Sequence, residues 1–266
     1  QHTRNPYSDY GYYFISDTAG EQRLISYAEA LDDTNAYDID WYTAYYLHEM
    51  EKINLIDKTG KSGGGREFYG ETLQANDKTL NVSFNTQHVR TDLPMTCFAD
   101  VAASSSENST FTLQLAGKST MVTIKPISTS DFETKAESGT MLLKTYPQTT
   151  GRQNVGLYYD YASSESSSMG YVNYIELNVP LQLTLQGSAI SICNTNYLFQ
   201  TRNTRYTLTN ATATTQIWRV TDGVNIEQIP TTINQNQMTW IGSNAQVEKY
   251  MAVDVRATNW HKPSYM

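Results

Sequence analysis

Short runs of apolar and β-branched residues, separated by polar turns, recur along most of this 266-residue chain. The run 171–179 is the most regular, because side chains alternate between the two faces of a strand with a period of two. One face is mostly apolar and is predicted to point into a core: Tyr171, Asn173, Ile175, Leu177 and Val179. The other face is predicted to point outward: Val172, Tyr174, Glu176 and Asn178.

Similar runs indicate further strands at a spacing typical of a β-sandwich. They are 12–15, 80–84, 95–102, 110–115, 121–127, 155–161, 189–193, 216–220, 238–241 and 248–255. The range 40–55 fits a helical stripe in part, but its density of aromatic residues favours a strand. The pattern therefore predicts an all-β fold, a jelly-roll or β-sandwich of the galactose-binding-like kind, preceded by a small β-rich N-terminal segment.

The best internal boundary is the stretch 58–65, which holds four glycines in eight residues and is predicted to be a flexible loop. The expected organisation is a β-rich segment at 1–62 and a sandwich domain at 63–266, with 200–266 as a small closing subdomain. The sequence Gly60-Lys61-Ser62 does not predict a phosphate-binding loop, because more glycine follows it where such a loop would open a helix.

Composition narrows the classes of function. Charged residues make up 17% of the chain, the formal net charge is -8 and the pI is about 5.0, with Lys and Arg scattered singly. A nucleic-acid partner is therefore not expected. No run approaches the roughly 18 apolar residues of a membrane span. Gln1 has no Met before it, and the first residues lack a basic start followed by an apolar stretch, so we expect any targeting peptide to have been removed already. We expect the chain to be exported.

The two cysteines give no sign of a catalytic site. Cys97 and Cys193 each lie inside a β-forming run, where a free buried thiol is the simplest interpretation. A cysteine nucleophile needs an imidazole within hydrogen-bond reach, and the four histidines are scattered through the chain: His2, His48, His88 and His261. No catalytic residue, cofactor or metal site is predicted, and whether the chain is an enzyme stays open.

Two acidic groupings remain as candidate sites. His48, Glu49 and Glu51 resemble a metal or acid-base cluster, but on a strand His48 would face away from both glutamates. We expect Glu49 or Glu51 to anchor the glycine-rich loop or Arg66 instead. The aspartates 32, 33, 38 and 40 leave calcium as an alternative, although their spacing matches no calcium loop.

The tryptophans have two interpretations, since exposed aromatic rings can stack on sugars. Trp218 and Trp240 lie within β-forming runs and are expected in the core, while Trp41 and Trp260 stay open. The candidate loop-anchoring or interface residues are Glu49, Glu51, Arg66, Glu67, Glu71, Trp41 and Trp260.

Four segments, in this order, are similar to a known family. They are Asn5-Pro6-Tyr7-Ser8-Asp9 before Tyr12-Tyr13-Phe14, the stretch 48–55 continuing to 65–71, the strand 170–178 with its Ile-Glu-Leu-Asn end, and Ile217-Trp218-Arg219-Val220-Thr221-Asp222. Together they resemble the region before the peptidase domain of PorU-type sortases, gingipain-related cysteine peptidases of the type IX secretion system. The Gly63-Gly64-Gly65 insertion and Arg219, where the family more often has an acidic residue, depart from the pattern.

This resemblance implies a parent protein at the cell surface, associated with the outer membrane, that removes the C-terminal sorting signals of secreted cargo proteins. The Cys and His of that activity would lie beyond Met266. The chain itself would be a non-catalytic scaffold that packs against the peptidase domain of the same polypeptide and helps to present the substrate. The alternative is a free-standing carbohydrate-binding or adhesin-like sandwich with a surface glycan as its partner.

Overall fold

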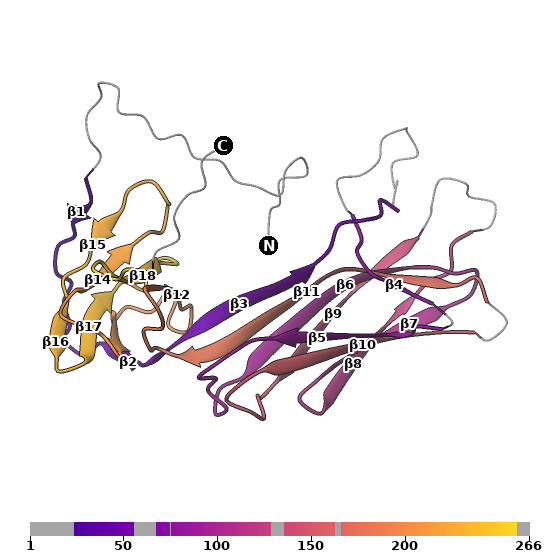
Figure 1. Ribbon diagram of the computed structural model, residues 1–266, viewed down its shortest axis with the longest axis horizontal. Helices are drawn as coiled ribbons and strands as arrows, with labels where there is room; N and C mark the ends of the chain where they lie inside the picture. Colours follow the sequence, from indigo (N-terminus) through magenta and orange to yellow (C-terminus); the bar gives the residue numbers. More distant parts are fainter. Residues whose placement is uncertain (1–23, 56–67, 75, 129–135, 163–165, 260–266) are drawn as a thin grey trace, which may run out of the picture.

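The computed structural model describes residues 24–55, 68–74, 76–128, 136–162 and 166–259. Every regular element in these ranges is a β-strand, which confirms the predicted all-β fold. No helix within the described ranges is long and apolar enough to cross a membrane. The strands form two pairs of sheets, which Figure 1 shows lying end to end.

The larger pair is a sandwich of antiparallel sheets. Its strands are β3 (Trp41–Glu49), β4 (Thr72–Leu73), β5 (Thr79–Phe84), β6 (Met95–Ser104), β7 (Ser109–Leu115), β8 (Lys118–Ile124), β9 (Glu137–Thr145), β10 (Gln153–Tyr161) and β11 (Met169–Gln182). One sheet has the order β3-β11-β6-β9, with β4 also paired to β11, and the other has the order β5-β10-β7-β8.

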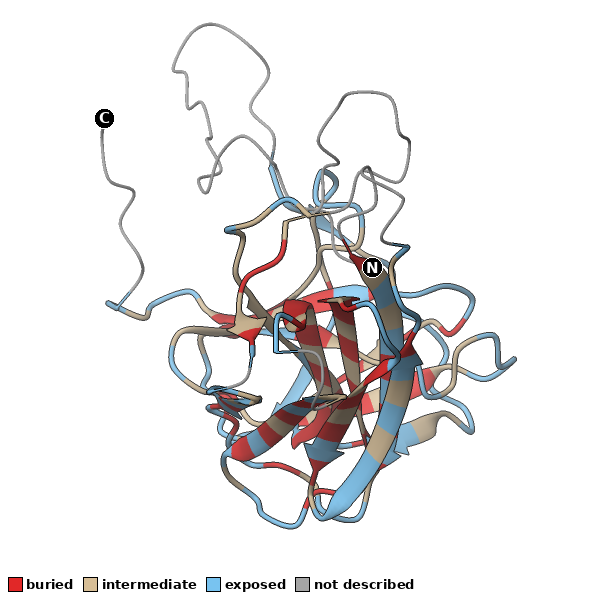
Figure 2. Ribbon diagram, turned by 90° about the vertical axis from the view of Figure 1, so that its right-hand side faces the viewer, coloured by how far each residue is buried: buried red, intermediate tan, exposed pale blue. Residues whose placement is uncertain are grey.

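The core of this sandwich follows from alternation along the strands. In β10, Val155, Leu157 and Tyr159 are at most 1% exposed, while the residues between them are exposed or half-buried. Figure 2 shows buried positions alternating in this way along the interior strands. The inward residues of the two sheets thus meet and remove their apolar surface from water, which is the main stabilising term of the fold.

Strand β11 confirms most of the predicted alternation and corrects one part of it. Ile175, Leu177 and Val179, all predicted to point inward, have no exposed surface. The pairing of β11 with β6 shifts register between Val172 and Tyr174, the mark of a β-bulge. Val172, predicted to point outward, is therefore in the main core, and Tyr171, predicted to point inward, packs with Tyr69 in a separate cluster on the other face.

The smaller pair of sheets uses strands from both ends of the chain. They are β1 (Ser26–Tyr27), β2 (Tyr37–Ile39), β12 (Ala189–Cys193), β13 (Thr204–Leu208), β14 (Thr215–Arg219), β15 (Glu227–Gln228), β16 (Thr232–Asn234), β17 (Gln237–Gly242) and β18 (Lys249–Asp254). The two sheets have the orders β1-β15-β14-β18-β12 and β16-β17-β13-β2. The early strands β1 and β2 join them through parallel pairing with β15 and β13.

Aromatic rings fill the space between these two sheets. Trp240 is 2% exposed, as predicted, and stacks on Tyr206 with ring centroids 4.9 Å apart. Trp218 is only half-buried, contrary to its predicted place in the core. The reason is strand alternation: Ile217 takes the inward position of β14 with no exposed surface, so the next side chain must point to the other face.

Most of the strands predicted after residue 40 are confirmed, although Met121–Ile127 overlaps β8 only in part. The sequence pattern does not predict β9 or β13, nor the short strands β1, β2, β4, β15 and β16. The predicted strand at 12–15 lies outside the described residues. Strand β3, from the predicted N-terminal segment, pairs along its whole length with β11. The boundary near residue 62 stays a prediction, because 56–67 also lie outside the described residues.

Candidate interaction surface

The outer face of the sheet β3-β11-β6-β9 carries a group of aromatic, aliphatic and acidic side chains. Strand register places them in two adjacent rows, because residues directly opposite each other share a face. One row is Leu47, Glu176, Phe98 and Leu142, and the next begins Glu49, Tyr174 and Asp100. Tyr45 lies two residues before Leu47 on the same face of β3. We call these eight residues the aromatic-acidic face.

Contacts between side chains organise this face. Phe98 and Tyr174 stack across β6 and β11 with ring centroids 5.9 Å apart. The Tyr45 hydroxyl donates a hydrogen bond of 2.9 Å to Glu176 Oε1 on the neighbouring strand. Tyr45 and Leu142 are 49% and 65% exposed, so the edges of the face offer apolar surface to a partner.

The charge on this face is predominantly negative. Glu49, Asp100 and Glu176 are the carboxylates of the two rows, and Lys144 lies beside them on β9. Partial burial, together with the adjacent Glu176 carboxylate, raises the pKa of Tyr45. Tyr45 therefore keeps its proton and acts as a hydrogen-bond donor. A partner that fits this surface would combine apolar groups with Arg or Lys.

At the end of β3, an ion pair joins the sheet to the segment that leads into β4. His48 Nε2 lies 2.6 Å from Glu71 Oε1, and both side chains are half-buried. Burial alone would raise the pKa of Glu71, but the hydrogen bond and charge of His48 lower it overall. The second carboxylate oxygen of Glu71 is buried and has no hydrogen-bond partner among the described residues. This contact holds the segment of Gly70 and Glu71 against the sheet.

The structure separates the predicted site residues. Glu49 belongs to the aromatic-acidic face, whereas Glu71 pairs with His48, which lies opposite Ile175 on the inner face of the sheet. Trp41 is at the far end of β3, where its carbonyl oxygen accepts a hydrogen bond from Asn194 Nδ2. Arg66, Glu67 and Trp260 lie outside the described residues, so the loop-anchoring role of Glu49 or Glu51 stays a prediction.

Three of the four aspartates considered for calcium, Asp33, Asp38 and Asp40, contact arginines. Arg205 Nη1 lies 3.0 Å from Asp38 Oδ1, and Arg90 Nη1 lies 2.7 Å from Asp40 Oδ1. Within the described ranges, no group of three or more His, Cys, Asp or Glu side chains is placed to hold a metal ion. Calcium binding stays a prediction, and thermal unfolding with and without calcium would test it.

Neither cysteine has the surroundings of a nucleophile. Cys97 has no exposed surface, and burial raises the pKa of its thiol to about 12. Cys193 is half-buried, and burial also raises its thiol pKa, although Lys249 opposes that effect. Both thiols are free. A raised pKa keeps a thiol protonated at neutral pH, and the protonated form is a poor nucleophile.

Sequence reasoning missed the main members of the face. Tyr45, Phe98, Tyr174 and Leu142 lie in separate strands, and only the pairing register brings them together. One signal was available: Tyr174 belongs to the face of 171–179 that was predicted to point outward. A single outward aromatic residue is common, so that signal becomes informative only when the register adds Phe98 and Leu142 beside it.

Comparisons with known proteins find a solved structure with a similar fold, but no relative by sequence. No family model matches the chain, and no curated protein matches it. The structure resembles dimeric latent PorU from Porphyromonas gingivalis, with a TM-score of 0.72 and 16% identity over 88% of this chain and 22% of that one. The chain thus spans about a fifth of the length of that protein, and the likeness shows a shared fold.

Two carbohydrate-binding modules are more distant. A CBM36 module in complex with calcium and xylotriose has a TM-score of 0.30 and 18% identity, over 50% of this chain and 98% of that one. The CBM35 of Cellvibrio japonicus Abf62 has a TM-score of 0.30 and 13% identity, over 50% of this chain and 92% of that one.

Proposed function

We propose that this chain is the non-catalytic N-terminal scaffold of a longer, exported cysteine peptidase of the PorU type, held at the cell surface. In this role it packs against the peptidase domain of its own polypeptide and helps to present cargo proteins whose C-terminal sorting signals are removed. The fold likeness to PorU supports the proposal, because it extends over 88% of this chain and accounts for 22% of that protein.

The observation that carries the proposal is the aromatic-acidic face. A sheet face that serves only as a solvated surface is usually covered by polar side chains, whereas this one presents Phe98, Tyr174 and Leu142. Aromatic residues are enriched at the centres of protein interfaces. The carboxylates among them favour a partner surface that carries Arg or Lys, which would fix the orientation of the two domains.

The test is association of this chain with the separately expressed peptidase domain of its parent protein. Leu142→Lys places a cation on the exposed apolar edge of the proposed contact, and we expect it to raise the Kd at least about tenfold, a loss of about 1.4 kcal/mol. Met121→Lys is the matched control, because Met121 is 64% exposed, close to the 65% of Leu142, but lies on β8 in the opposite sheet.

Calorimetry or surface plasmon resonance would measure both variants against the unmodified chain. Equal loss of affinity in both variants would contradict docking through the aromatic-acidic face. Absence of binding by the unmodified chain at any concentration would contradict the scaffold role itself.

A surface glycan is the alternative partner, since aromatic residues on a β-sandwich can stack on sugar rings. Phe98 and Tyr174 already stack on each other at an interplanar angle of 27°, so part of each ring is covered. This arrangement favours a protein partner. Retention of the chain on a glycan array, lost on replacing Tyr174 with Ser, together with no association with the peptidase domain, would reverse that preference.

A further inference from the structure

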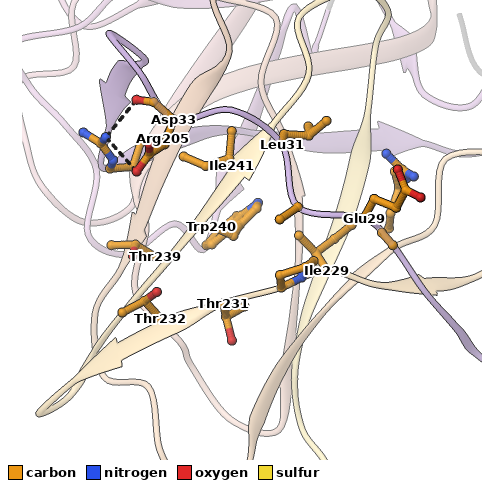
Figure 3. A pocket seen from close by; sticks show the side chains of 14 residues that line it. Glu29, Leu31, Asp33, Arg205, Ile229, Thr231, Thr232, Thr239, Trp240 and Ile241 are labelled. Atoms are coloured by element: carbon orange, nitrogen blue, oxygen red, sulfur yellow. Dashed lines mark hydrogen bonds and ion pairs between the residues drawn. The ribbon is translucent and has the colours of Figure 1, made fainter.

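A pocket of about 200 Å³ lies at the rim of the smaller pair of sheets, away from the aromatic-acidic face. Two connections that cross from one sheet to the other form its walls. Residues 28–33 lead from β1 toward β2, and residues 229–232 lead from β15 into β16. Trp240 of β17 lines it from the inside, as Figure 3 shows.

Trp240 is the unusual feature of this pocket. Its side chain is 2% exposed, and its Nε1 hydrogen has no acceptor within the described ranges of the chain. Figure 3 shows this nitrogen directed toward the side of the pocket that carries Leu31 and Ile229. The ring cannot turn to find another acceptor, because it stacks on Tyr206 at 4.9 Å and meets the edge of Tyr250 at 5.9 Å. Buried donors are nearly always satisfied, so this one indicates a missing acceptor.

The charges around the pocket balance. Two arginines and two acids line it, namely Arg205, Arg219, Glu29 and Asp33. Both arginines already have carboxylate partners, since Arg205 Nη1 lies 3.0 Å from Asp38 Oδ1 and Arg219 Nη1 lies 3.1 Å from a carboxylate oxygen of Glu248. An anionic ligand would have to compete with those carboxylates, and a cationic ligand would meet two guanidinium groups. A neutral ligand is therefore favoured.

The rest of the lining mixes hydroxyl and aliphatic groups. Thr231, Thr232 and Thr239 supply groups that both donate and accept hydrogen bonds, while Ile229 and Ile241 supply apolar surface. The volume exceeds the roughly 30 Å³ share of a single water molecule several times over. A ligand with one strong acceptor, one weaker donor and a small apolar part would satisfy this lining.

We propose that this pocket binds a neutral amide group, whose carbonyl oxygen accepts the Trp240 Nε1 hydrogen and whose alkyl part packs on Ile229 and Ile241. The amide N–H then donates to a threonine hydroxyl or to Glu29. Such a group can come from the acetamido substituent of an N-acetylated sugar or from the carboxamide side chain of a peptide. The site is separate from the proposed docking face and does not depend on it.

The pocket wall formed by residues 29–31 can move to let a ligand reach Trp240. Within the described part of the chain, Glu29, Ala30 and Leu31 make no hydrogen bond. The anchors lie on either side: Ala28 N donates to Gln228 O at 3.0 Å, and Asn203 Nδ2 donates to Asp32 O at 2.9 Å. The stretch between these anchors can shift outward and expose the indole N–H without breaking a hydrogen bond.

The experiment is a titration of the ¹⁵N-labelled chain followed by NMR of the indole N–H signals. The probes are N-acetylglucosamine for the sugar source, propionamide for the carboxamide source, and glucose as the control without an amide. We expect the Trp240 signal to move downfield with a Kd on the order of 1–10 mM, as befits so small a ligand. Trp218 is the internal control, because its indole already donates to Gln216 Oε1 at 2.9 Å.

The pattern of shifts decides the outcome. A shift with both amides supports the shared chemistry, and a shift with one of them supports it and identifies the source. No shift with either amide, or an equal shift with glucose, overturns the proposal. Trp240→Phe keeps an aromatic ring against Tyr206 but removes the donor, and we expect amide binding at least about tenfold weaker. If that variant does not fold, the titration of the unmodified chain decides alone.

Discussion

A single methyl group at Gly170 should test the packing of the sandwich sharply. A Cβ at this position of β11 would lie 2.8 Å from Phe111 Cζ and 2.8 Å from Tyr159 Cγ. Neither ring can easily give way: both have no exposed surface, and their centroids are 4.7 Å apart. The Tyr159 hydroxyl is also held by Ser168 Oγ at 2.7 Å. Gly170→Ala therefore forces a shift of one sheet against the other.

The expected magnitude follows from two opposing effects. Overpacking a filled core lowers the free energy of unfolding by about 1–3 kcal/mol. Replacing Gly with Ala also restricts the unfolded chain, which raises the free energy of unfolding by about 0.4–1 kcal/mol. We expect Gly170→Ala to lower the free energy of unfolding by about 1–2 kcal/mol, or the Tm by about 2–8 °C for a chain of this size. Urea unfolding followed by circular dichroism or tryptophan fluorescence measures it.

Gly156 of β10 provides the matched control. A Cβ there would have Asn81 Oδ1 at 3.6 Å as its nearest neighbour, which is ordinary van der Waals contact. Gly156→Ala should leave the free energy of unfolding within about 0.5 kcal/mol of the unmodified chain or raise it slightly. If Gly170→Ala were as stable as Gly156→Ala, the close approach of β11 to the rings of the facing sheet would be wrong.

Three further predictions concern buried polar groups. Glu248→Gln should lower the free energy of unfolding, measured in urea, by about 2–4 kcal/mol. The side chain of Glu248 is 4% exposed and forms an ion pair with Arg219, which would lose this carboxylate partner. An unchanged free energy of unfolding would contradict a stabilising ion pair. The pKa of Glu71 is lower in the folded state, so its contact with His48 stabilises the fold at pH values above the ordinary carboxyl pKa of about 4.3. This stabilisation disappears as the pH falls through the folded-state pKa. Glu71→Gln should therefore make the free energy of unfolding depend less on pH on the acid side. In native buffer a thiol reagent should leave Cys97 unmodified and react with Cys193 only slowly, as mass spectrometry would show, with Cys97 reacting on unfolding.

The sequence predicts the fold class well because most strands carry their own alternating pattern. Val155, Leu157 and Tyr159 in β10 alternate with polar residues, and that period alone identifies a half-buried strand. Strand β9 shows the opposite case. Its first half, Glu137–Thr140, contains Glu, Ser, Gly and Thr, so the pattern there resembles a loop. It becomes a strand because it pairs along its length with β6, whose inward residues are buried by the facing sheet.

The bulge at Asn173 marks a limit of reasoning from one strand at a time. A period of two predicts the faces correctly only while the pairing register is unbroken, and the extra residue moves Val172 into the core and Tyr171 out of it. Nothing in the local sequence distinguishes 171–173 from a regular strand, since apolar side chains occur on both faces there. The partner strand β6 decides which side each residue takes.

The candidate surfaces were harder to predict than the core because they depend on contacts between strands distant in sequence. Phe98 and Tyr174 are 76 residues apart, and each alone has the properties of an ordinary core residue. The sequence analysis lists Glu49 and Glu71 together as candidate loop-anchoring or interface residues. Strand parity instead puts Glu49 on the outer face and leaves Glu71 with His48 on the inner side. The core positions of a strand can be predicted from the alternation within that strand. An interaction surface on a sheet depends on the register between strands, which no single strand's sequence contains. A surface of this kind therefore becomes visible only when the order and register of the strands are known.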